Sequence, residues 1–327
     1  MTPDPAPPID LPAPRSTRSA PVRMRGRAEA PGVAVLVVLL AGALACGCGQ
    51  SAAEGHTDGS SRSAPTAAGP TSPPPSRAES LAAQDAVDAF RVDIDQAGAA
   101  FVADVDRLQS AVDRRAVPAA RTDELAAQAD DDRFRALESD DDQVTAATLD
   151  ELAGDVGTHQ SFGGLHAVER DLWTSGDAAQ DITGLVAQAP VAQYLLAKEV
   201  LAPEAIASTG VDELSWVDDT AVPGREELYS RRDAVDIVAT VGAAHEAFAC
   251  VEALGHLVDP SLTTSVDQLF DRLLDTVGSL GDPDLIQDRD ISAPVRLSLS
   301  QQVDATAALL SQLAAALVPF GTTGPSS

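Results

Sequence analysis

The sequence is poor in aromatic, cysteine and basic residues, and these shortages exclude several classes of protein. Aromatic residues make up only 3% of the 327 residues, and there are three cysteines. Three cysteines cannot form the disulfide framework of a small secreted scaffold. The 22 Lys and Arg residues are outnumbered by 50 Asp and Glu residues, which gives a formal net charge of −28. Such a chain lacks the basic surface that neutralises phosphates, so a nucleic-acid-binding function is excluded.

The chain does have enough apolar residues for a large core, since 44% of its residues are hydrophobic. Abundant Ala, Leu and Val with few aromatics favours helices packed through small side chains over a β-sandwich. No alternating strand pattern of useful length is present. The sequence therefore predicts an all-α domain over residues 78–322, with either one large core or two fused helical bundles.

Periodicity and capping signals predict where the helices lie. Ser76 and Glu79 have the spacing of a capping box, which predicts a helix start. Asp259 followed by Pro260 predicts the end of one helix and the immediate start of the next. The expected helices are 79–114, 121–138, one through Leu149 and Leu152, one containing His166, 186–201 ending before Pro203, 237–254, one from Pro260, and 299–317.

The N-terminal region has the pattern of an export signal. A 13-residue apolar run at 33–45 follows five arginines, and a helix of that length is too short to cross a bilayer, which needs about 20 residues. The sequence predicts a signal peptide over residues 1–45. Met24, followed by Arg25, Gly26 and Arg27, is the more typical place for such a signal to begin.

A cysteine directly after the apolar run resembles a bacterial lipobox, in which the cysteine is lipidated and becomes the mature N-terminus. Cys46 is the preferred site and Cys48 is the alternative, while a plain cleaved signal peptide is the competing interpretation. Residues 46–77 are rich in Ser, Gly, Ala, Thr and Pro, which predicts a disordered tether behind the lipid. We therefore expect a lipid-anchored protein on the outer face of the cytoplasmic membrane.

Two runs of aspartate, Asp130–Asp132 and Asp140–Asp142, have two interpretations. They are candidate cation sites, but acidic runs more often lie in solvated loops between helices. The solvated loop is the favoured interpretation.

The most informative local motif is His166 and Glu169, which lie three residues apart after Gly163 and Gly164. On a helix, this spacing places an imidazole and a carboxylate on one face, where both can reach one metal ion. Such a ligand pair suits iron or zinc. The motif alone is weak, because His-x-x-Glu arises often by chance.

Two motifs carry a family resemblance. The first is Gly164-x-His166-x-x-Glu169 followed by Leu172-Trp173, and the second is the segment 224–233, Gly-Arg-Glu-Glu-Leu-Tyr-Ser-Arg-Arg-Asp. Together they resemble the imelysin-like family, which includes the EfeO and EfeM components of bacterial iron uptake and whose own segment is Gly-x-Glu-Glu-x-Tyr-Ser-His-Thr-Asp. Helix 186–201, the segment 243–248 and a degenerate copy of an Arg-x-Leu-Glu helix at 134–138 extend the resemblance over roughly residues 78–319.

The resemblance implies a pair of four-helix bundles in one domain, with a metal site in a cleft around the His-x-x-Glu helix. The implied metal ligands are His166, Glu169, Glu227, Asp233 and Glu138. Tyr229 and Ser230 are implied to line the same cleft. No catalytic residue is implied by the binding function.

The chain also departs from the family pattern. Arg231 and Arg232 replace the family's His-Thr, and Ala234-Val235 replace its Leu-Trp. Two arginines near a cation site oppose metal binding unless they point away or pair with acids. The N-terminal cupredoxin domain of some EfeO-type proteins has no counterpart here, and Cys250 fits a buried small apolar residue.

We therefore expect an iron-binding lipoprotein that delivers its metal to a membrane permease, with a haem-type peroxidase as a further partner. Zinc or another divalent metal is an alternative cargo. One alternative function is a zinc-dependent imelysin-type metallopeptidase, although a His-Glu-x-x-His motif is absent. The other is a metal-free envelope adaptor with a decayed site. Residues 1–77 contain seven Arg and five acidic residues, so the acidity belongs to the remaining chain, with 15 basic and 45 acidic residues.

Overall fold

The computed structural model describes residues 74–135, 149, 151–152 and 162–321. All regular secondary structure in these residues is helical, which confirms the all-α fold class. The predicted signal peptide, both candidate lipidation sites at Cys46 and Cys48, most of the tether, Glu138 and the run Asp140–Asp142 lie outside the described residues.

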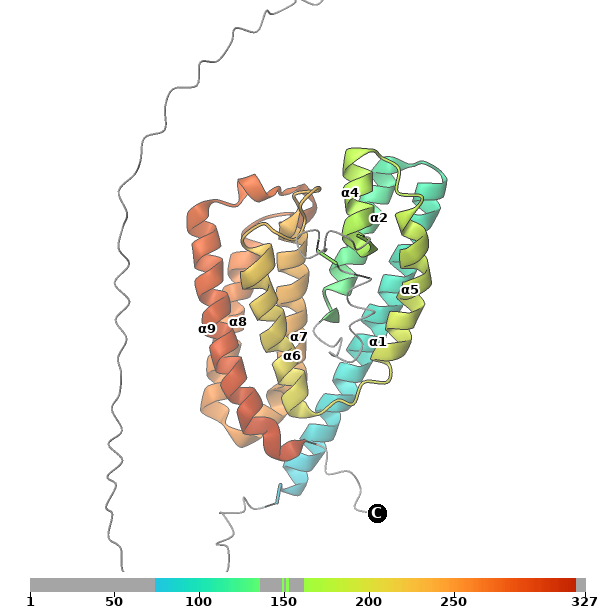
Figure 1. Ribbon diagram of the computed structural model, residues 1–327. Helices are drawn as coiled ribbons and strands as arrows, with labels where there is room; N and C mark the ends of the chain where they lie inside the picture. The colour runs from blue at the N-terminus through green and yellow to red at the C-terminus, as the bar shows by residue number, and fades with distance from the viewer. Residues whose placement is uncertain (1–73, 136–148, 150, 153–161, 322–327) are drawn as a thin grey trace, which may run out of the picture. The chain divides into compact units, whose positions relative to one another are not determined.

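Four α-helices from the N-terminal half of the described chain pack against one another (Figure 1). They are α1 (Arg77–Asp113), α2 (Val117–Asp131), α4 (Gly164–Thr174) and α5 (Asp181–Leu196). Helix α1 contacts α2 and α5, and α4 contacts the same two helices. The result is a closed group in which each helix has two neighbours.

The C-terminal half forms a second group of four helices (Figure 1). They are α6 (Pro203–Trp216), α7 (Asp233–Val258), α8 (Pro260–Gly278) and α9 (Ala293–Leu317). A π-helix, η3 (Val217–Ala221), continues α6, and short 3-10 turns follow α8 and α9: η4 (Pro283–Leu285), η5 (Asp288–Asp290) and η6 (Val318–Phe320). Helix α7 packs against α1 and α2 as well as its own group, so it joins the two halves.

The predicted caps are present at the predicted helix starts. Ser76 Oγ accepts a hydrogen bond from the Glu79 amide at 3.2 Å, and the Glu79 carboxylate accepts one from the Ser76 amide at 2.6 Å. Asp259 accepts from the Leu262 amide at 3.0 Å, and Pro260 occupies the first turn of α8. Local side-chain hydrogen bonds thus satisfy amides that a helix N-terminus leaves unpaired.

Three sequence predictions about this part of the chain were wrong. Helix α2 begins at Val117 rather than at 121 and ends at Asp131 rather than at 138. The helix predicted at 186–201 is α5, which spans Asp181–Leu196 and so ends before 201. Pro203 begins the next helix, α6, because a proline is well tolerated in a first helical turn, where its missing N–H has no partner to lose. Asp131 and Asp132 are 1% and 0% exposed rather than solvated, because they lie at the end of α2 that faces the interior.

Aromatic pairs lie in the core of each half. Phe101 and Phe134 meet edge to face with ring centroids 5.5 Å apart, and Phe248 stacks on Phe270 at 5.3 Å. Helices α7 and α9 are both long and apolar enough to cross a bilayer by length and composition. The most apolar window of α7 is 61% buried within the fold, so core packing accounts for its composition.

Candidate metal centre

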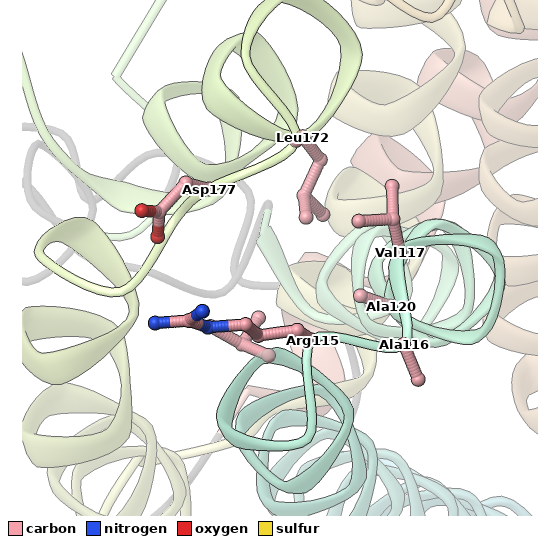
Figure 2. A pocket seen from close by; sticks show the side chains of 8 residues that line it. Arg115, Ala116, Val117, Ala120, Leu172 and Asp177 are labelled. Atoms are coloured by element: carbon pink, nitrogen blue, oxygen red, sulfur yellow. The ribbon is translucent and has the colours of Figure 1, made fainter.

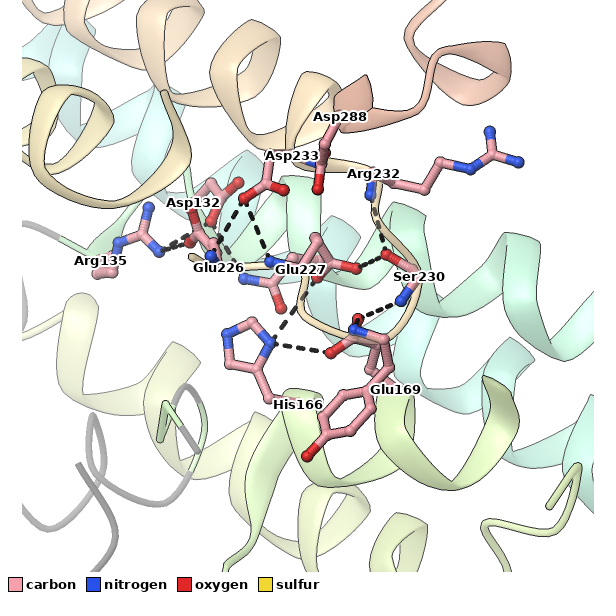
Figure 3. Close-up of polar contacts among 12 residues, drawn as sticks. Asp132, Arg135, His166, Glu169, Glu226, Glu227, Ser230, Arg232, Asp233 and Asp288 are labelled. Carbon is pink, nitrogen blue, oxygen red and sulfur yellow. Dashed lines mark hydrogen bonds and ion pairs between the residues drawn. The ribbon is translucent and has the colours of Figure 1, made fainter. Parts of the chain in front are cut away.

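The predicted His-x-x-Glu motif lies in the first turns of α4. Gly164 has φ of +73°, a left-handed conformation that favours glycine, and the helix begins there. His166 and Glu169 follow one turn apart and point to the same side (Figure 3). Their exposed fractions are 1% and 0%, so both are held inside the protein.

Glu227 joins this pair from the segment between η3 and α7. His166 Nδ1 lies 3.6 Å from Glu169 Oε2 and 3.8 Å from Glu227 Oε1 (Figure 3). One ligand atom from each of the three residues lies within 4.8 Å of the other two. Ligands about 2.1 Å from a tetrahedral ion are roughly 3.4 Å apart, so this spacing suits one metal ion. We refer to His166, Glu169 and Glu227 as the metal triad.

Each carboxylate of the metal triad is fixed through one oxygen. Glu169 Oε1 accepts from the backbone amides of Tyr229 at 2.8 Å and Ser230 at 2.6 Å. Ser230 also donates its hydroxyl to Glu227 Oε2. The other oxygens, Glu169 Oε2 and Glu227 Oε1, have no hydrogen-bond donor and face His166. Outer hydrogen bonds of this kind orient metal ligands and raise affinity.

A fourth acidic side chain belongs to the same group, and sequence reasoning missed it. Glu124 of α2 is 0% exposed, and neither of its carboxylate oxygens has a hydrogen-bond partner. Burial raises its pKa well above the usual range, the negative charge of Glu169 raises the pKa further, and His166 lowers it. Glu124 is not one of the three residues grouped within 4.8 Å, so it adds a third buried carboxylate that acts on the metal triad electrostatically.

The sequence did contain a signal for Glu124. The buried face of α2 carries Ala120 and Ala127, but also Glu124, Gln128 and Asp131 at helical spacing. Acidic residues on the face of a helix that packs into a core usually have a structural or functional role, because burying each one costs desolvation free energy. A polar row at helical spacing among small apolar residues was thus the available indication.

Burial shapes the electrostatics of the whole site. It raises the pKa of Glu227 well above the usual range, the charges of Glu124 and Glu169 add to that rise, and His166 and the Ser230 hydroxyl oppose it. Carboxylates in this setting are stable only when they are protonated or paired with a cation. The site therefore holds either protons or a positive ion.

Asp233 has a different place from the one predicted. It is not one of the three residues grouped within 4.8 Å. Its Oδ1 accepts from the amides of Glu226 at 3.1 Å and Glu227 at 3.3 Å, so it holds the segment that presents Glu227. Burial and the neighbouring Asp288 raise the pKa of Asp233 to about 8. Its position indicates that it supports the site rather than binding the ion directly.

A second acidic cluster lies beside the metal triad, around Arg135. The guanidinium of Arg135 is 2.7 Å from Glu226 and 3.1 Å from Asp132, and it stacks over the Trp216 ring at 4.1 Å. Asp236 of α7 is buried in the same region, and burial with the charges of Glu226 and Asp132 raises its pKa well above the usual range. This cluster contains a cation of its own, the Arg135 guanidinium.

The two arginines that depart from the family pattern do not face the metal triad. Arg231 is exposed and has φ of +62°, and the Arg232 side chain extends away from His166 and Glu169 (Figure 3). The backbone amide of Arg232 donates to Ser230 Oγ at 3.2 Å, so only its main chain takes part in the site. The electrostatic objection to a cation at this site therefore does not apply.

The structure thus brings together three of the five predicted ligands, His166, Glu169 and Glu227. Ser230 lies beside them, and Tyr229 contributes a backbone amide. These three residues are buried, with exposed fractions of 0% to 1%. A scan against models of protein families and a search of curated proteins both gave no match to this chain.

Proposed function

We propose that the protein is an extracytoplasmic, lipid-anchored lipoprotein that binds iron and delivers it to a membrane permease, as in EfeO- and EfeM-type uptake. The observation that carries the proposal is the buried metal triad of His166, Glu169 and Glu227, with the buried carboxylate of Glu124 acting on it electrostatically. Oxygen-rich ligand sets with one imidazole suit iron, and zinc or another divalent ion is the alternative cargo.

Charge supports capture of a cation. Three buried carboxylates carry up to three negative charges, which match a ferric ion or exceed a ferrous ion by one. The strongly acidic domain outside the site raises the local concentration of cations near its surface. The imelysin-like motifs supply the further expectation of a permease partner and a haem-type peroxidase in the same system.

The burial of the metal triad favours binding over peptide hydrolysis. A zinc peptidase keeps an open coordination position for water and admits a polypeptide chain. Here the imidazole and both carboxylates are almost completely covered. The site geometry suits retention of an ion, and the metallopeptidase interpretation has no comparable observation in its favour.

Metal titration tests the proposal directly. Purified metal-free protein is titrated with Fe²⁺ without oxygen, with a soluble Fe³⁺ chelate, and with Zn²⁺, and binding is followed by calorimetry and by the melting temperature. We expect saturable binding of one ion per chain by the wild type. Glu169→Gln and Glu227→Gln should each lower affinity by at least tenfold, because each loses a charged ligand.

The chain offers a matched control for this experiment. His256 and Glu252 of α7 also form a His–Glu pair at 3.5 Å, but both side chains are about 40% exposed. The variants His256→Ala and Glu252→Gln should bind metal like the wild type. Equal affinity for wild type and both site variants would remove the assignment, and cleavage of a denatured protein substrate would favour the peptidase.

A further inference from the structure

A surface pocket of about 300 Å³ lies where α2, α4 and the start of α7 meet. Leu125 and Pro118 form apolar parts of its wall, and Thr122 adds a hydroxyl. The remaining lining residues are Arg121, Trp173 and Arg232. None of the six lining residues is acidic, although the chain as a whole carries a net charge of −28.

Arg232 is the unusual member of this lining. Its Nε and Nη1 atoms are buried, and neither has a hydrogen-bond partner. No ion pair involving Arg232 occurs among the described residues within 4.0 Å, and its side chain points away from the metal triad (Figure 3). Buried guanidinium donors without an acceptor are costly, so Nε and Nη1 of Arg232 require water or an anion in the pocket.

Arg121 places a second positive charge on the same pocket. Its Nε and Nη2 donate to the Leu172 carbonyl at 3.1 and 2.7 Å, and its guanidinium lies 5.1 Å from the centre of the Trp173 ring. These contacts fix the orientation of Arg121, and none of them involves a carboxylate. The positive charges of Arg121 and Arg232 therefore both remain uncompensated by the residues that line the pocket.

A neighbouring pocket serves as a comparison, because the charges of its lining residues cancel. It has a volume of about 240 Å³ and is lined by residues that include Arg115, Leu172 and Asp177 (Figure 2). One arginine and one aspartate there have opposite charges, and the other lining residues carry none. The Arg121–Arg232 pocket has two arginines and no acid, so the two pockets differ in net charge by two units.

We propose that the Arg121–Arg232 pocket binds a small oxyanion, a carboxylate or a phosphate. Guanidinium groups bind both through charge-assisted hydrogen bonds, and a volume of 300 Å³ admits a small organic acid or a phosphate with its ordered water. The pocket is separate from the metal triad, although the Arg232 amide, the Ser230 hydroxyl and Glu227 connect the two through successive hydrogen bonds.

Calorimetric titration of metal-free protein with citrate and with inorganic phosphate tests this proposal and distinguishes the two chemical sources. We expect saturable binding of at least one anion by the wild type, weakening as salt is added. Arg232→Gln should lower the affinity by about 10- to 100-fold, since charge-assisted hydrogen bonds are lost. Arg232→Lys should retain part of the affinity, because it keeps the charge.

The neighbouring residue supplies the control. Arg231 is the adjacent residue and its side chain is exposed. Arg231→Gln removes one positive charge, as Arg232→Gln does, but it should leave anion affinity unchanged. Glu169→Gln should lose metal affinity but bind the anion like the wild type, whereas Arg232→Gln should lose anion affinity. The two experiments therefore distinguish a wrong metal site from a wrong anion pocket. Absence of saturable binding of either anion, or equal effects of Arg231→Gln and Arg232→Gln, would overturn the proposal.

Discussion

Asp233 provides a quantitative test of the buried acidic region. Its pKa is raised from 3.8 to about 8 by burial and by Asp288, so the folded protein keeps a proton that the unfolded chain releases. Between about pH 4 and about pH 8 the folded state binds one more proton at this site. The stability contributed by this group is therefore complete at low pH and is lost as the pH rises.

The substitution Asp233→Asn should remove the loss of stability at high pH while keeping the hydrogen bonds that Asp233 makes. An asparagine can still accept from the Glu226 and Glu227 amides and can donate to Asp288. One proton corresponds to about 1.4 kcal/mol per pH unit, so the variant should gain about 3.5 kcal/mol over the wild type between about pH 5 and about pH 8. Below about pH 4, where the aspartate is protonated in both the folded and the unfolded state, the two proteins should be nearly equal in stability.

The assay is urea unfolding of metal-free wild type and variant across that pH range, with the difference in unfolding free energy plotted against pH. Asp271→Asn, an exposed aspartate on α8, is the control and should show a constant difference. The reasoning fails if the difference between Asp233→Asn and wild type is the same at all pH values, because Asp233 would then be charged or exposed in the folded state.

Two further predictions concern the metal triad itself. Ser230→Ala should weaken metal binding by about 10- to 100-fold, because Glu227 loses the hydroxyl that orients it, and competition against a chelator of known affinity would measure the change. Metal affinity should also rise with pH, since the raised pKa values of Glu124 and Glu227 mean that an entering ion displaces protons. Calorimetry in two buffers with different ionisation enthalpies would count those protons, and a value of zero would contradict the assigned environment.

Local signals in the sequence were sufficient to predict most of the described helices, although not α6, and half of the proposed ion-binding group. The Ser76–Glu79 capping box and the Asp259 N-cap followed by Pro260 each involve residues within four positions of one another. They can therefore be recognised in the sequence without knowledge of the tertiary structure. The pairing of His166 with Glu169 is local for the same reason, because a helical turn brings them together. The all-α class followed from composition and from the lack of alternating patterns.

Contacts between distant segments could not be predicted in the same way. Glu124 acts on the metal triad because α2 packs on α4, and the polar row on α2 does not by itself predict that packing. Glu227 was predicted through a family motif, but the hydrogen bond from Ser230 that orients it was not. Asp233 accepts hydrogen bonds from the Glu226 and Glu227 amides because α7 begins at Asp233 and packs next to that segment. This arrangement depends on tertiary packing, which local sequence signals do not predict.

The buried acids fall into two groups that should respond differently to neutralisation. The first group is Glu169 and Glu227 of the metal triad with Glu124, whose charge acts on them, and the second is Asp233 and Asp236, which interact with other acids beside the triad. Replacing a carboxylate of either group by its amide should leave the metal-free protein as stable or more stable above neutral pH, since a costly buried charge is removed. A ligand that binds only the folded state adds stability as its concentration rises. The first group alone should lose that added stability when substituted, so comparing each variant with and without metal separates acids that bind the ion from acids that support the fold.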